Sequence, residues 1–195
     1  YPRRRRGMTV NDEEIELILL DAGEKMEGAV SHARREFSTV RTGRASSALF
    51  ERLTVEAYGV EMKLQELASF SVPEARQLIV TPHDIANLDA IEKAIINSNM
   101  GLSPSNDGRI IRLSFPMLTE ERRRDLAKVV GGMAEEAKQR VNGVRRSARK
   151  ELEDLDGVSE DDVRGAETQL DALKDDFIGM IDAAQAQKEE ELLEV

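Results

Sequence analysis

Seven basic side chains lie on one stretch of the sequence, residues 119–155, that has the periodicity of a long helix. On an idealised helical wheel these side chains share an arc of about 140°. They are Arg124, Lys128, Lys138, Arg145, Arg146, Arg149 and Lys150. A row of cations along a helix suits a phosphate backbone, because a guanidinium can hold two phosphate oxygens at once. The spacing therefore predicts a nucleic-acid-binding face on this helix.

A second interpretation of the same face is that its cations pair with acidic neighbours. Residues 119–150 carry ten basic and five acidic residues, whereas residues 151–195 carry three basic and sixteen acidic ones. The whole chain has a net charge of −10. Some of the cations must therefore face the acidic C-terminal segment, and the charge pattern by itself leaves both interpretations open.

No group of residues has the composition of an active site. The chain has no cysteine, which removes thiol catalysis, disulfides and cysteine-ligated zinc. Its two histidines, His32 and His83, lie 51 positions apart, so a histidine metal site or catalytic triad is not expected. Gly131-Gly132 lacks the Lys-Ser/Thr pair of a phosphate-binding loop. The sequence predicts a protein that is not an enzyme and that uses no metal or cofactor.

Three segments have apolar residues at steps of three and four, the pattern of amphipathic helices. The first begins near Asn11 and ends at Arg41–Arg44, and the second runs from Thr119 to Gly157. The third begins after Ser159 and ends near Leu193. Each helix has one apolar face that must be covered by another element, which predicts a three-helix bundle.

The residues between the first two helices change to the two-residue period of strands. Strands are predicted over residues 53–57, 60–64, 68–72, 78–81, 103–106 and 110–113, with a helix over 87–97. This pattern predicts an α+β protein in which a small β/α/β domain is inserted into a long three-helix bundle. The expected parts are a flexible extension over 1–8, the bundle over 9–42 and 117–195, and the inserted domain over 43–116.

Two linkers must join these domains, and each contains a residue that interrupts regular structure. Gly43 lies in the first linker and Pro116 in the second. The candidate hinge residues are Arg41, Thr42, Gly43, Arg44 and Ala45 in the first linker and Ser114, Phe115 and Pro116 in the second.

Several glycines lie inside the predicted long helices, where each costs about 1 kcal/mol relative to alanine. They are Gly23, Gly28, Gly131, Gly132 and Gly143. We expect close packing between helices to explain them, and close approach of a partner's backbone is the alternative.

Six short pieces of sequence, in this order, resemble the bacterial ribosome recycling factor family. They are Val-Arg-Thr-Gly-Arg-Ala (40–45), Tyr-Gly (58–59), Ile-Glu-Lys-Ala-Ile (91–95), Gly-Leu-Ser-Pro (101–104), Leu-Thr-Glu-Glu-Arg-Arg (118–123) and Val-Arg-Arg (144–146). Each piece is weak alone, but the ordered set covers nearly the whole chain from Met8. The resemblance implies a three-helix bundle with an inserted β/α/β domain on flexible linkers, in an L-shape.

The resemblance also implies a function. A factor of this family binds the large ribosomal subunit after termination and, with elongation factor G and GTP, splits the ribosome into subunits. By family motif, Arg41 and Arg44 lie at the hinge close to ribosomal RNA, and Arg145, Arg146 and neighbouring cations face the RNA. The expected partners are thus ribosomal RNA and elongation factor G, with no membrane and no DNA, and the chain is expected to be a monomer.

This sequence departs from the family at one place within the basic segment. The family typically has Arg-Asn before the motif at 144–146, whereas this chain has Asn142 and Gly143. One expected phosphate contact is therefore missing, and Arg149 and Lys150 could compensate for it.

A helical protein–protein adaptor with no ribosomal role is the alternative function. It predicts a constitutive oligomer in which the basic face pairs with acidic helices. The chain has no run of 18 uncharged apolar residues, and no apolar segment follows its basic first residues. We therefore expect a cytoplasmic protein.

Overall fold

The computed structural model describes residues 10–194, so the extension predicted over 1–8 lies outside the described residues. The described chain divides into two compact units. The helical unit contains residues 10–40 and 124–191, and the sheet unit contains residues 41–123 and 192–194. The α+β class, with long helices and a separate sheet, is confirmed.

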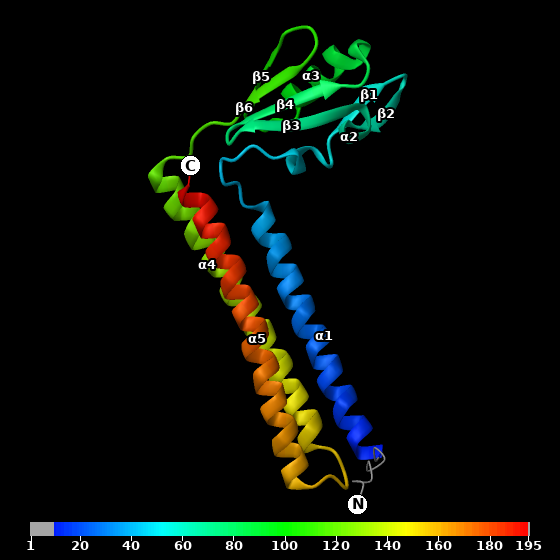
Figure 1. Cartoon of the computed structure of the whole chain (residues 1–195), viewed down its shortest axis with the longest axis vertical. Coiled ribbons are helices and arrows are strands. Elements are labelled where there is room, and N and C mark those ends of the chain that lie inside the picture. Colours follow the sequence, from blue (N-terminus) through cyan, green and yellow to red (C-terminus); the bar gives the residue numbers. More distant parts are fainter. Residues whose placement is uncertain (1–9, 195) are drawn as a thin grey trace, which may run out of the picture. The chain divides into compact units, whose positions relative to one another are not determined.

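Three long helices form the helical unit: α1 (Val10–Thr39), α4 (Glu120–Glu153) and α5 (Glu160–Leu193). Their axes run side by side (Figure 1). The hydroxyl of Thr119 accepts a hydrogen bond from the Arg122 N–H at 3.1 Å, and Ser159 accepts one from the Asp162 N–H at 3.1 Å. Each of these residues therefore caps the helix that follows it. At the end remote from Thr119, the Asn11 amide donates to the carbonyl of Gly157 at 2.8 Å and so ties α1 to the α4–α5 turn.

The core of the helical unit is built mainly from small and aliphatic side chains. The residues buried on α1 are Ala22, Met26, Ala29, Val30, Ala33 and Phe37, and those on α4 are Leu126, Val130, Ala134, Ala137, Val141, Ala148 and Leu152. Their steps of three and four confirm the predicted amphipathic helices. Met133 and Val144 also fit the periodic pattern of α4, but they are only half-buried.

The sheet unit contains a two-stranded and a four-stranded antiparallel sheet. The first pairs β1 (Thr54–Ala57) with β2 (Val60–Lys63). The second has the order β3-β4-β6-β5, with β3 (Ala68–Glu74), β4 (Gln77–Pro82), β5 (Ser103–Asn106) and β6 (Ile111–Ser114). Helix α3 (Leu88–Asn97) and the short turns η1 (Ser47–Phe50), α2 (Leu64–Leu67) and η2 (Ile85–Asn87) complete the unit.

One face of α3 closes the core of the sheet unit. Leu88, Ile91 and Ile95 are buried there, as the helical period predicts. They belong to one core with residues of both sheets and with Phe50, whose ring stacks on Phe70 at a centroid distance of 6.1 Å.

The β1–β2 hairpin is attached to the start of α3 through a tyrosine. The Tyr58 hydroxyl donates to Asp84 Oδ2 at 2.7 Å and accepts from the side-chain amide of Asn87 at 3.2 Å. The Tyr58 hydroxyl and the Ala86 N–H lower the pKa of the Asp84 carboxyl, because both stabilise its charged form. These bonds hold the hairpin turn against η2, with Asn87 buried between them.

Close helix packing does not explain the internal glycines, so that expectation is wrong. A Cβ built on Gly23, Gly28 or Gly132 meets no atom within 4 Å, and at Gly143 the nearest atom is Arg146 Nη2 at 3.9 Å. Among these five glycines only Gly131 faces another helix, with Gln185 Nε2 at 3.8 Å. Alanine therefore has room at these positions.

We expect Gly28→Ala to raise the free energy of unfolding by about 1 kcal/mol, because alanine fits and restricts the unfolded chain. Urea unfolding followed by circular dichroism measures this change. Gly157→Ala is the matched control and should be destabilising, because Gly157 has a φ of +74°. A destabilising Gly28→Ala would contradict the finding that this position has free space.

Candidate nucleic-acid interface

Packing against α5 divides the basic face of α4 into two rows. Lys138, Arg145 and Arg149 form the inner row, which lies along the border with α5. Lys128, Arg146 and Lys150 form the outer row, which lies on the exposed side of the helix. The apolar stripe of α4 is buried, so the helical period fixes which cations belong to each row.

Every member of the inner row forms an ion pair with a carboxylate of α5. The ammonium of Lys138 lies 2.5 Å from Asp182, and Arg149 Nε lies 3.1 Å from Glu167. Arg145 Nε pairs with Asp171 between them. The inner row therefore follows the second interpretation of the charge pattern, in which α4 cations pair with the acidic third helix.

In two ion pairs of the inner row, the pKa of one partner is shifted. The hydrogen bond from Arg145 lowers the pKa of the Asp171 carboxyl, because it stabilises the carboxylate. The hydrogen bond to Asp182 raises the pKa of the Lys138 ammonium for the corresponding reason. The side chains of Lys138 and Arg145 are only 21% and 28% exposed, so these cations are partly withdrawn from solvent.

The outer row keeps its charges available. Lys128, Arg146 and Lys150 are exposed, and none of them forms an ion pair with any residue in the described range 10–194. From Lys128 to Lys150 the row spans about 33 Å at 1.5 Å per residue. Arg124 extends the face toward the start of α4 and is itself engaged in an interaction. The outer row is the part of the predicted face that could hold phosphates without first breaking an ion pair.

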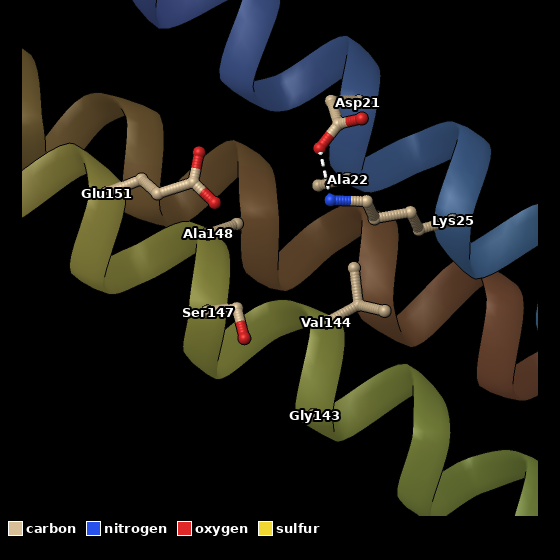
Figure 2. A pocket seen from close by; sticks show the side chains of 8 residues that line it. All are labelled: Asp21, Ala22, Lys25, Gly143, Val144, Ser147, Ala148 and Glu151. Carbon is tan, nitrogen blue, oxygen red and sulfur yellow. Dashed lines mark ion pairs between the residues drawn. The ribbon is translucent and has the colours of Figure 1, made fainter.

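A shallow groove of about 240 Å³ lies between α1 and α4, next to the departure at Gly143 (Figure 2). The ammonium of Lys25 forms an ion pair with Asp21 at 2.7 Å, and Glu151 of α4 lies on the opposite wall. Both carboxylates raise the pKa of Lys25, Asp21 more strongly than Glu151. Because this cation is already neutralised, the groove adds no positive site to the basic face.

The first predicted linker is held to the sheet unit at several points. Arg41 Nη1 donates to the carbonyl of Met100 at 3.3 Å, and the Ala45 N–H donates to the carbonyl of Ala75 at 2.8 Å. Thr42 is buried, and Gly43 has a φ of +79° that favours glycine. Arg44 pairs with Glu194 near the C-terminus.

The second predicted linker begins inside regular structure. Ser114 is the last residue of β6, and the N–H of buried Phe115 donates to the carbonyl of Arg76 at 2.8 Å. These two residues are therefore anchored in the sheet unit. Pro116 is the first residue of this linker that lies beyond those bonds.

Comparison with known proteins accounts for this combination of long helices and inserted sheets. Residues 33–193 match the family model described as ribosome recycling factor. The chain belongs to the ribosome recycling factor family. Family membership confirms the resemblance seen in the sequence, and it assigns the chain to ribosome recycling and to no enzyme class.

Relatives in the family match over almost their whole length. The ribosome-recycling factor of Acidothermus cellulolyticus is 49% identical over 184 residues, which are 93% of this chain and all of the relative. That of Bacillus subtilis is 44% identical over 181 residues, 91% of this chain and 98% of the relative.

Two structures of the family have the same fold. A solution structure of the ribosome recycling factor has a TM-score of 0.74 and 40% identity, and the match covers 93% of this chain and 98% of that one. A structure of the T. thermophilus factor, bound with E. coli elongation factor G to the E. coli post-termination complex, has a TM-score of 0.62 and 36% identity. That match covers 92% of this chain and 98% of the other.

The sequence predicted the basic face of α4 but did not identify the acidic residues that pair with its inner row. They are Asp171, Asp182 and Glu167. These acidic partners could have been predicted from the sequence, because α4 and α5 are antiparallel helices joined by the turn at Gly157. Residues at similar distances before and after that turn therefore lie side by side.

We expect Asp171→Asn to lower the free energy of unfolding at neutral pH by at most about 1 kcal/mol, because the ion pair with Arg145 is partly exposed. The folded-state pKa of Asp171 lies below its unfolded value. The stabilisation is therefore complete above about pH 3.9 and is lost as the pH falls through the folded-state pKa. Urea unfolding of both proteins at several pH values measures this difference.

Asp176→Asn is the matched control, because Asp176 lies on the same helix and has no ion pair within residues 10–194. It should leave the stability at neutral pH nearly unchanged. The Arg145–Asp171 pair does not contribute to stability if the two substitutions change the free energy of unfolding equally. The same conclusion follows if the difference between Asp171→Asn and the unsubstituted protein persists at pH values below the folded-state pKa of Asp171.

Proposed function

We propose that this chain binds the large ribosomal subunit after termination through ribosomal RNA. With elongation factor G and GTP, it then splits the ribosome into subunits and releases mRNA and tRNA. The observation that carries the proposal is the match to the ribosome recycling factor family over residues 33–193. The related T. thermophilus factor, bound with elongation factor G to a post-termination complex, supports the same partners.

The outer row supplies the proposed contact with RNA. Lys128, Arg146 and Lys150 are exposed cations without an acidic partner in the range 10–194, and a phosphate backbone brings repeated negative charges along a similar length. Arg146 can bind two phosphate oxygens in its guanidinium plane, whereas the lysines act as point charges. The acidic surface of α5, with three charged residues in its first turn, would be repelled by RNA. This asymmetry would select one face of the helical unit.

The other cations predicted to contact RNA differ in how many existing bonds they must give up to bind it. Arg41 uses one of its five N–H groups to bind Met100, so most of its donors remain for RNA. Arg44 must exchange Glu194 for phosphate, and the inner row must exchange α5 carboxylates. We therefore assign RNA affinity first to the outer row and Arg41, and only secondarily to Arg44, Lys138, Arg145 and Arg149.

The two linkers are proposed to act as a hinge. The bonds at Ala45 and Phe115 anchor the inner ends of the linkers in the sheet unit, and the residues from Pro116 lie beyond them. For Arg41–Arg44 to move, the contacts of Arg41 with Met100 and of Arg44 with Glu194 would have to break. Elongation factor G would act through the sheet unit while the stiff helices remain on the RNA. We further propose that the chain works as a monomer in the cytoplasm, where ribosomes act.

We expect Arg146→Ala to weaken binding to isolated large subunits and to reduce the slope of log affinity against log salt by about 1, because one phosphate contact is lost. Co-sedimentation or fluorescence titration at several salt concentrations measures both quantities. Arg140→Ala is the matched control, because Arg140 is exposed on α4 but lies outside the outer row. Equal effects of both substitutions would remove the special role of the outer row.

We expect post-termination ribosomes to dissociate only when this protein, elongation factor G and GTP are all present, as followed by light scattering. Removing Thr42 and Gly43 should preserve binding to large subunits but abolish splitting, because the shortened linker cannot adjust. Splitting that survives this deletion would contradict the hinge. A constitutive oligomer that does not bind ribosomes would instead favour the helical adaptor.

A further inference from the structure

The outer edge of β1 is open, and it borders a groove of about 600 Å³. Strand β1 pairs only with β2 among the described strands. The groove is lined on one side by Leu53, Thr54 and Glu56, and on the other by residues of α3. Figure 1 shows β1 and α3 in the same part of the sheet unit. This site belongs to the sheet unit, shares no residue with the basic face of α4 and has no part in the proposed contact with RNA.

The hydrogen-bond register shows which backbone groups face the groove. The Leu64 N–H donates to the carbonyl of Leu53 at 3.0 Å, so the pair Leu53–Leu64 is hydrogen-bonded. Hydrogen-bonded pairs alternate along an antiparallel ladder. Thr54, opposite Lys63, and Glu56, opposite Glu61, are therefore the pairs without these bonds. The N–H and C=O groups of Thr54 and Glu56 point away from β2 and toward the groove.

A second face of α3 forms the other wall. Leu88, Ile91 and Ile95 are buried in the core, but the groove is lined by Ala90, Lys93, Ala94 and Asn97, which recur at three- and four-residue steps. The two alanines leave space beside the strand edge. Lys93 and Asn97 place hydrogen-bond donors along the wall.

The charges on the exposed face of the β1–β2 hairpin favour a cation beside Glu56, whereas the α3 wall of the groove carries the cation Lys93. Glu56 and Glu61 are directly opposite on the exposed face of the hairpin, and like charges in such a pair destabilise a sheet. Lys63 shares this face, but within residues 10–194 neither glutamate forms an ion pair with it or with another cation. A basic side chain on a strand added next to β1 would lie beside Glu56 and reduce this repulsion.

We propose that this groove binds an extended segment of a partner protein, which adds to the edge of β1 as a further strand. The segment has a basic residue beside Glu56, flanked by small apolar residues that face Ala90 and Ala94. Backbone hydrogen bonds to Thr54 and Glu56 provide affinity, and the alternate side chains provide specificity, as in other strand-addition sites. A second copy of β1 fits poorly, because it would bring further glutamates to the Glu56–Glu61 pair.

The test uses the full chain labelled with ¹⁵N and the peptide acetyl-Ser-Thr-Val-Lys-Val-Thr-Ser-amide. We expect the amide signals of Thr54 and Glu56 to shift on titration, with a dissociation constant below about 1 mM. The matched peptide with Glu in place of Lys should bind at least about tenfold more weakly, because its carboxylate would meet Glu56. Absence of these shifts at several millimolar peptide, or equal binding of the two peptides, would overturn the proposal.

Two variants test the geometry. Thr54→Pro removes an N–H that faces the groove, at an edge position where proline is tolerated, and should abolish binding while the remaining spectrum stays folded. Glu56→Lys should reverse the preference between the two peptides. Glu74→Lys, the charge-matched control on β3, should change neither. If Glu56→Lys does not alter the preference, or if the edge signals change with protein concentration alone, a peptide site is excluded, and in the latter case a second copy occupies the edge.

Discussion

Burial of one apolar stripe on each long helix is the constraint on which the helical unit depends. The stripe of α4 runs from Leu126 to Leu152 and cannot face water over that length without a large loss of stability. Once it is covered by α1 and α5, the helical period places every other residue of α4 on a defined side. The two basic rows are a consequence of this packing. Residues at the border meet the acidic α5, whereas residues opposite the stripe meet solvent.

Charge therefore has two roles on the same helix. Lys138, Arg145 and Arg149 hold α4 against α5 through partly exposed ion pairs, each of which contributes modestly. Lys128 and Arg146 have no such role within residues 10–194, and they account for the positive surface that an RNA partner requires. The inner row therefore follows the ion-pair interpretation of the charge pattern, and the proposed contact with RNA rests on the outer row.

A different constraint applies to the sheet unit. The backbone N–H and C=O groups along the outer edge of a strand stay unpaired unless another segment covers them. The four-stranded sheet and α3 share one core, and Tyr58 attaches the short β1–β2 hairpin to it through Asp84 and Asn87. This arrangement leaves an open edge on β1. Its short length and its glutamates limit pairing between copies, yet they leave a groove suited to a basic extended segment.

The sequence by itself determined the elements and the family, because both depend on local information. The three- and four-residue steps located α1, α4 and α5, and the two-residue period located β5 and β6. Ordered motifs such as residues 40–45 and 144–146 indicated the family that the comparison confirmed. The tertiary structure alone decided which cations are paired. Arg145 and Arg146 are neighbours in sequence, but only Arg145 lies close enough to Asp171 to form an ion pair. It also decided that the internal glycines have free space and that β1 has an open edge, since both depend on which groups lie nearby in three dimensions.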